Sequence, residues 1–255
     1  MSRHETMMTR PFATLLVAFL ASACAGGSGS SAGSDQAAIG TVLGGARPAA
    51  APRAEPIPWE SLFDGTTLSG WHGFRTPGRI PAGWKVVEGT ITRVAAAGDL
   101  VTDRTYANFE LELEWQIEES GNSGVLYRID PTVDTPARSA PEYQLLDDAG
   151  HPDGGNPMTS SGAAFGVVPV GGLVPKPAGL WNTLRLVVNG DRVEHWYNGA
   201  RILAYELGST AWEGFWRSSR FSDVPAYGRT QRGFIGLRDE GTRIAFRNLR
   251  IRELP

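Results

Sequence analysis

Residues 141–153, PEYQLLDDAGHPD, carry the side chains in this chain that are best suited to chemistry. Only here does a histidine, His151, stand beside several carboxylates, so the stretch could exchange protons with a ligand or bind its polar groups. Residues 142–146 alternate polar and bulky side chains, as a half-buried strand does. Glu142 and Gln144 would share one face of that strand. The pattern predicts a ligand surface; the alternative is a solvent-facing strand that ends in a polar turn.

The strands that must position this stretch are marked by a period of two. Residues 108–118 place apolar side chains on one face and glutamates on the other. We interpret the glutamates as a solvated sheet face rather than a catalytic or metal cluster. Residues 121–130 form a turn followed by a strand, in which Val125, Tyr127 and Ile129 are expected to share a face opposite Arg128.

Turn signals divide the remaining chain into short strands. Residues 83–94 indicate a hairpin around Glu88 and Gly89, and two Asn-Gly pairs, at 189–190 and 198–199, predict a three-stranded meander. A capping box of Thr210 and Glu213 predicts one helix over residues 210–219. About ten short strands and a single helix favour an all-β sandwich or barrel.

The N-terminus has the features of an export signal. Basic residues precede an apolar run over residues 12–21, which is shorter than the roughly 20 residues of a membrane span. Small residues then lead to Cys24, the only cysteine of the 255-residue chain. This resembles the lipobox of bacterial lipoproteins, so we predict a signal peptide over residues 1–23 and lipidation at Cys24. The alternative is ordinary signal cleavage that leaves a free thiol.

Residues 24–58 are rich in Gly, Ser, Ala and Pro and are interpreted as a flexible tether, which leaves residues 59–255 as the folded domain. The net charge is −3 with no basic run, so nucleic acid is not an expected partner. The prediction is an exported, membrane-anchored protein on the periplasmic or outer-membrane side.

The order of several motifs resembles the family of bacterial 3-keto-disaccharide hydrolases. The motifs include GNSGVLYRID, PEYQLLDDAGHPD, EHWYNG and RGFIGLRDEG, and the similarity runs over residues 59–254. It implies an antiparallel two-sheet jelly roll of the concanavalin A-like, glucanase type. It also implies action on glycosides whose sugar is oxidised at C3, made by an oxidoreductase of the same pathway.

A ketone at C3 acidifies the proton on C2, so a base can remove it and the group on C1 can leave by elimination. Water can then add back, which gives net hydrolysis. Such a site needs a base, a group that stabilises the enolate and an acid for the leaving group.

The resemblance implies candidates for these roles. His151 and Glu142 would be acid or base, and Arg128 or Lys176 would stabilise the enolate or hold a hydroxyl. Gln144 and Asp148 would bind substrate. We expect Arg128, Glu142 and His151 to meet in one groove. Each has a structural alternative: His151 could cap a turn, and Arg128 could only pair with Glu142 across strands. His72 and His195 are not expected to be catalytic.

A divalent metal ion is a possible cofactor. The acidic residues near His151, with Asp147 as the candidate ligand, offer oxygen and imidazole ligands, although their spacing fits no named metal-binding loop.

Two other functions compete with the 3-keto-glycosidase. Lectins use the same sandwich, so a non-catalytic carbohydrate-binding module is the main alternative. A conventional glucanase needs two carboxylates about 5–10 Å apart, and Gln144 cannot be the second carboxylate beside Glu142.

Overall fold

The protein is described by a computed structural model that covers residues 57–171 and 175–255. The predicted signal peptide, Cys24 and the predicted tether up to residue 56 lie outside these residues. In the described part of the chain, no helix combines the length and apolar character needed to cross a membrane.

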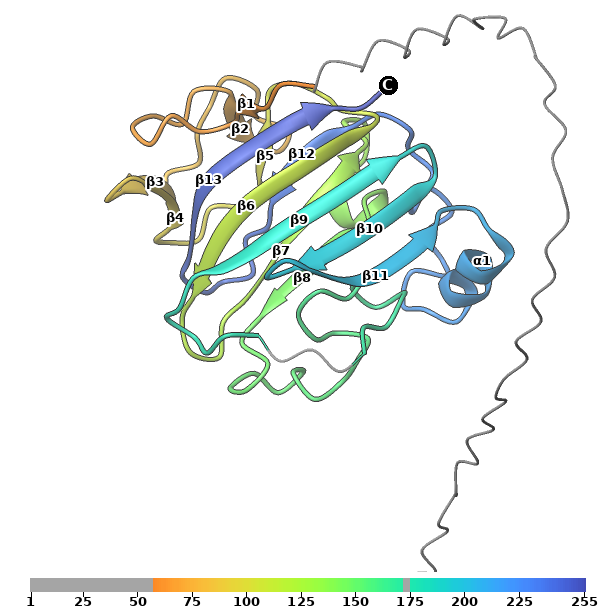
Figure 1. Ribbon diagram of the computed structural model, residues 1–255. Coiled ribbons are helices and arrows are strands. Elements are labelled where there is room, and N and C mark those ends of the chain that lie inside the picture. Colours follow the sequence, from red (N-terminus) through yellow and green to blue (C-terminus); the bar gives the residue numbers. More distant parts are fainter. Residues whose placement is uncertain (1–56, 172–174) are drawn as a thin grey trace, which may run out of the picture. The chain divides into compact units, whose positions relative to one another are not determined.

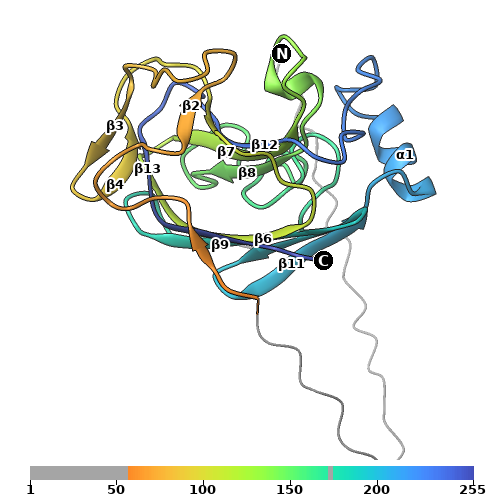
Figure 2. The ribbon, with the colours of Figure 1, turned by 90° about the horizontal axis from the view of Figure 1, so that it is seen from above.

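Two antiparallel sheets pack face to face, as Figures 1 and 2 show. The larger sheet contains, in spatial order, β11 (Ala200–Glu206), β10 (Arg192–Tyr197), β9 (Asn182–Asn189), β6 (Phe109–Ile117), β13 (Ile244–Glu253), β4 (Thr90–Arg93) and β3 (Trp84–Val87), with β1 (Glu60–Ser61) paired to β13. The smaller sheet contains β2 (Trp71–Gly73), β5 (Leu100–Thr102), β12 (Phe234–Leu237), β7 (Asn122–Ile129) and β8 (Glu142–Leu146). The predicted two-sheet jelly roll is confirmed.

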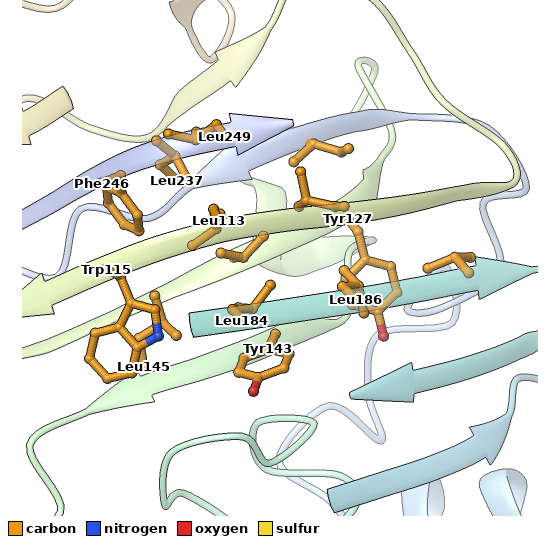
Figure 3. Close-up of a cluster of buried hydrophobic side chains, with 14 of the residues drawn as sticks. Leu113, Trp115, Tyr127, Tyr143, Leu145, Leu184, Leu186, Leu237, Phe246 and Leu249 are labelled. Carbon is orange, nitrogen blue, oxygen red and sulfur yellow. The ribbon is translucent and has the colours of Figure 1, made fainter. Parts of the chain in front are cut away.

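The alternation in β6 explains how the layers meet. Leu111, Leu113 and Trp115 are buried between the sheets, whereas the intervening glutamates point outward. Figure 3 shows this interior, where Leu113 and Trp115 of the larger sheet face Tyr143 and Leu145 of the smaller one. A buried leucine stabilises a fold by roughly 1.5–3 kcal/mol. The buried face of β6 therefore contributes free energy that holds the two sheets together.

Both predicted Asn-Gly turns form hairpins, but the loop of the first one is shifted by one residue along the chain. Asn198 and Gly199 both have positive φ (46° and 85°), as a two-residue hairpin of the Asn-Gly kind requires. At the other Asn-Gly pair, Asn189 lies opposite Arg192 in the register, so the loop residues are Gly190 and Asp191. Gly190 alone has positive φ (59°), because a turn with glycine first needs only that one unusual residue.

The helix α1 (Thr210–Arg217) begins at the residue that was predicted as its cap, so the actual cap lies one residue earlier. Ser209 is the cap residue, and its hydroxyl accepts a hydrogen bond from the backbone N–H of Trp212. The prediction of Thr210 as the cap was wrong because the preceding serine offers the same oxygen at the correct position. Trp212 is buried and stacks on Tyr205 of β11, so the helix covers one end of the sheets beside that strand (Figure 1).

Strand β7 does not keep one face to its end. Val125 and Tyr127 point into the main core as predicted, but Ile129 belongs to a second cluster with Leu126 on the opposite face. The cause is Arg128, whose φ of 53° lies in the left-handed region and accompanies a register shift against β12. The expectation that Ile129 shares a face with Tyr127 was wrong, because such a bulge reverses the alternation.

Candidate active site

The outward face of the smaller sheet carries a buried carboxylate, that of Glu142. Tyr143 and Leu145 of β8 point into the core, so Glu142 and Gln144 point outward, as the alternation predicted. Most of this outward face is covered: Leu126 and its neighbours pack against Phe74 and Phe234. Glu142 lies beyond this cover, at the β7–β8 end of the sheet.

Glu142 forms an ion pair with Arg238, which follows β12 in the chain. The glutamate is only 2% exposed, whereas the arginine side chain keeps 21% exposure and also pairs with Glu240. The Arg238 guanidinium lies 5.8 Å from the centre of the Phe165 ring, which borders the pair with an aromatic surface. The ion pair therefore reaches the molecular surface through its arginine.

A missing side chain makes this pairing possible. Glycine at position 124 lies on β7 between the two partners: its carbonyl accepts the Arg238 backbone N–H at 3.0 Å, and β8 flanks it on the other side. A Cβ at this position would overlap the carboxylate of Glu142. The second glycine of the GNSG motif, Gly124, is thus explained by the close approach of the Glu142 side chain from the neighbouring strand.

The surroundings of Glu142 favour its protonated form. Burial raises the pKa of Glu142 to about 7; Arg238 opposes this rise, and Glu240 and Asp99 add to it. Oε1 of Glu142 is buried and has no hydrogen-bond partner among the described residues. A carboxylate with a free oxygen and a pKa near neutrality is suited to accept and return a proton.

Two amide side chains, those of Gln144 and Asn122, lie on the same outward face. Gln144, also buried, donates from Nε2 to Oδ1 of Asn122 at 3.1 Å. Because both side chains combine donors with acceptors, they can exchange this bond for bonds to sugar hydroxyls. The position of Gln144 beside Glu142 agrees with its predicted face, while its predicted role in substrate binding stays a prediction.

Arg128 does not join this site, and the expectation that it meets Glu142 was wrong. Its side chain is buried, and its guanidinium donates to the carbonyl oxygens of Ala107 (2.9 Å) and Gly190 (2.8 Å). The positive φ of Arg128 turns the side chain away from the outward face. Burial lowers the pKa of Arg128 from its usual value. Arg128 therefore connects β7 to the β9–β10 turn. The arginine that lies beside Glu142 is Arg238.

His151 lies in the loop after β8, where its Nδ1 accepts the backbone N–H of Asp153 at 3.1 Å. The expected contact with Glu142 is not among its hydrogen bonds or ion pairs. Lys176 is also engaged elsewhere, donating from Nζ to the carbonyl of Trp181 at 2.9 Å, next to β9. The expected meeting of His151 with Glu142 in one groove is therefore not observed among the described contacts, and the predicted role of Lys176 stays a prediction.

The acidic residues before His151 are engaged with the backbone. Asp147 accepts the N–H of Ser120 at 2.8 Å, and Asp148 accepts that of Ser161 at 2.8 Å. Burial raises the pKa of Asp148 to about 6. Within residues 57–171 and 175–255, no group of three or more His, Cys, Asp or Glu side chains is arranged to hold a metal ion. The predicted metal ligand Asp147 is thus not part of such a group.

His195 has the structural environment that was expected for it. It is fully buried, stacks on Tyr143 at 4.4 Å between ring centres, and shares a hydrogen bond between Nδ1 and the Gly162 carbonyl. Burial lowers the pKa of His195 to about 4. His72 lies on β2, at the edge of the smaller sheet that is far from β8, and pairs with Asp103 just after β5.

The sequence pattern does not single out Arg238, although the residue lies in the motif RGFIGLRDEG. The available signal was the abrupt change from an apolar strand to three consecutive charges at 238–240. Its pairing with Glu142 could not be read from the sequence, because 96 residues separate the two.

Comparisons with known proteins agree on one family. Residues 58–252 match the model of the 3-keto-alpha-glucoside-1,2-lyase-like domain. The chain is similar to a 3-keto-disaccharide hydrolase of Bacteroides thetaiotaomicron, with 30% identity over 226 residues, which are 76% of this chain and 78% of that protein.

Solved structures give the same picture. A crystal structure from Parabacteroides distasonis with a provisional glycosyl hydrolase designation is 30% identical, covers 77% of this chain and 94% of its own, and has a TM-score of 0.72. A second structure from that organism, with the same designation, is 26% identical, covers 77% of this chain and 100% of its own, and has a TM-score of 0.61.

Proposed function

Because the chain belongs to the family of 3-keto-α-glucoside-1,2-lyase-like domains, we propose that it cleaves glycosides that carry a ketone at C3 of the sugar, with Glu142 as the base. Membership in this family makes the chain a glycoside-cleaving hydrolase; the proposal concerns its substrate and mechanism. The observation that carries it is a buried, outward-facing glutamate with a pKa of about 7 and an oxygen that has no hydrogen-bond partner within residues 57–171 and 175–255.

The proposed first step removes the proton on C2. Oε1 of Glu142 takes this proton, the C2–H electrons form the enolate with the C3 ketone, and the negative charge moves onto the ketone oxygen. The Arg238 guanidinium, held beside Glu142, stabilises that oxygen. Proton transfer by a positioned group contributes about 10²–10⁴-fold in rate.

In the second step the enolate collapses and the bond from C1 to the leaving oxygen breaks, which leaves a C1–C2 double bond. Water then adds its hydroxyl to C1, and the remaining proton of that water goes to the oxygen of the leaving group. Glu142, whose proton exchanges with solvent, protonates C2, so the sum is hydrolysis. Gln144 and Asn122 would hold sugar hydroxyls, and the ring of Phe165 would lie against an apolar sugar face.

The N-terminal sequence supports a location for this reaction. We infer from the apolar run and Cys24 that the enzyme is exported and lipid-anchored, so it would meet glycosides outside the cytoplasm. An oxidoreductase that makes the 3-keto sugar would supply its substrate.

The test compares a 3-keto glucoside of a chromogenic alcohol with the same glucoside unoxidised. We expect the full-length protein to release the alcohol from the oxidised substrate only, and Glu142→Gln to lower kcat at least 10²-fold. Glu88→Gln, an exposed glutamate in the β3–β4 turn, is the matched control and should leave kcat unchanged. Saturable binding without release of the alcohol would support the lectin-like alternative instead.

A further inference from the structure

A hollow of about 940 Å³ is lined mainly by residues of the larger sheet, whereas Glu142 belongs to β8 of the smaller sheet. This volume is within the range of about 300–1,000 Å³ that is usual for ligand pockets. We propose that this hollow binds a neutral oligosaccharide, at a site separate from the catalytic one. Because the two sites lie on different sheets, the inference does not depend on the proposed reaction.

The floor of the hollow is one straight row of side chains across five neighbouring strands. In the register, Trp196 lies opposite Arg185, Arg185 opposite Glu112, Glu112 opposite Arg250, and Arg250 opposite Ser61. All five line the hollow. With neighbouring strands about 4.8 Å apart, the row extends over roughly 19 Å, which suits an oligosaccharide rather than a single sugar ring.

Trp196 forms one end of this row, and Trp59 lies near the other end, two residues before Ser61. The guanidinium of Arg185 lies 4.8 Å from the ring centre of Trp196, and that of Arg250 lies 4.6 Å from the ring centre of Trp59. Trp196 is also fixed by a hydrogen bond of 3.0 Å from its indole N–H to Glu194. Both rings are partly exposed. Aromatic rings held in place this way bind the apolar face of a sugar with little loss of side-chain entropy.

The charges of the row select for hydroxyl groups rather than ions. Glu112 accepts a hydrogen bond from Arg250 at 2.9 Å and lies 3.9 Å from Arg185, so each charge has a partner. The charged residues that line the hollow are Asp64, Glu112, Glu114, Arg185 and Arg250, with a net charge of 2 − 3 = −1. An anionic ligand would find no excess of positive charge. Sugar hydroxyls both donate and accept hydrogen bonds, so they match alternating guanidinium and carboxylate groups.

The experiment measures binding of linear, unoxidised pentasaccharides of glucose, xylose and galactose to the full-length protein. Isothermal titration calorimetry gives the affinity, and tryptophan fluorescence reports the site. We expect saturable binding of at least one pentasaccharide, weakened at least tenfold by Trp59→Ala and by Trp196→Ala. Trp216→Ala is the matched control, because Trp216 is a partly exposed tryptophan under an arginine, Arg229, but lies on α1 outside the hollow.

Glu142→Gln separates this proposal from the catalytic one. It should leave pentasaccharide binding unchanged, and Trp196→Ala should leave cleavage of a small 3-keto glucoside unchanged, which also shows that the variant is folded. The proposal is overturned if no pentasaccharide binds, if Trp216→Ala weakens binding as much as Trp196→Ala does, or if Glu142→Gln abolishes it.

Discussion

A glutamate on the outward face of a sheet is ordinarily solvated, whereas Glu142 is enclosed and its pKa is raised. The enclosure depends on two neighbours: Arg238 supplies a positive charge, and glycine at position 124 leaves the room for the carboxylate to reach it. Desolvation opposes ionisation more strongly than the arginine favours it, so the proton stays on Glu142 up to about pH 7.

This balance predicts a stability effect with a defined sign. The pKa of Glu142 is about 7 in the folded protein and close to its usual 4.5 when unfolded. The folded state therefore binds the extra proton, and the stability contributed by this group is lost as pH rises from about 4.5 to 7. Urea unfolding at several pH values should show wild type losing on the order of 3 kcal/mol relative to Glu142→Gln across this window. A parallel pH dependence in the two proteins would contradict the raised pKa.

A side chain at position 124 would test whether Glu142 needs the space that this glycine leaves free. Gly124→Ala places a methyl group where the carboxylate lies, so the ion pair with Arg238 must separate. We expect about 1–3 kcal/mol of destabilisation and a large loss of kcat on 3-keto glucosides. Gly155→Ala is the matched control, because nothing lies within 4 Å of its added Cβ. Equal activity in the two variants would show that the glutamate does not need its present position.

At the scale of elements, alternation predicted most strands, and a single bulge caused the main error. The sequence indicates β6, β8 and the β9–β11 meander because hydrophobic side chains recur with period two. It does not indicate that Arg128 takes a positive φ, since this conformation is set by contacts with Ala107 and Gly190 in other elements. For the candidate site, the alternation of residues 142–146 predicts that Glu142 faces outward. Its pairing with Arg238 depends on contacts between distant parts of the chain and could not be predicted.

Because Arg128 connects β7 to the β9–β10 turn through hydrogen bonds, its replacement should lower the free energy of unfolding without changing kcat. Arg128→Leu leaves two buried carbonyl groups without their donor, and we expect it to lower the free energy of unfolding by about 3–5 kcal/mol. The kcat of the folded fraction at low temperature should be unchanged. Arg217→Leu, at an exposed helix position, is the control. A stable Arg128→Leu protein with impaired kcat would restore the catalytic role that the sequence suggested.

At the scale of the whole molecule, the sandwich presents two different outward faces. The smaller sheet carries Glu142 and Arg238, and the larger sheet carries the row between Trp59 and Trp196. The main core isolates one face from the other, so catalysis and glycan binding can be changed independently. This arrangement would let the protein hold a glycan on one side while it cleaves an oxidised glycoside on the other.

The predicted lipid anchor also belongs to this scale. Cys24→Ser removes the only thiol that could be acylated. We expect the wild-type protein, expressed in a Gram-negative host, to incorporate labelled palmitate and to sediment with membranes. The serine variant should incorporate none and should stay in the soluble fraction. Sedimentation of both proteins alike would contradict the anchor.

The proposed reaction begins when Glu142 removes the C2 proton of a 3-keto sugar. Cleavage of a 3-keto disaccharide in D₂O, followed by NMR of the product, tests it most directly. With wild type we expect one deuterium at C2 of the released 3-keto sugar, because the proton on Glu142 exchanges with solvent, and with Glu142→Gln at least 10²-fold slower incorporation. Cleavage by wild type that leaves the original hydrogen at C2 would contradict it.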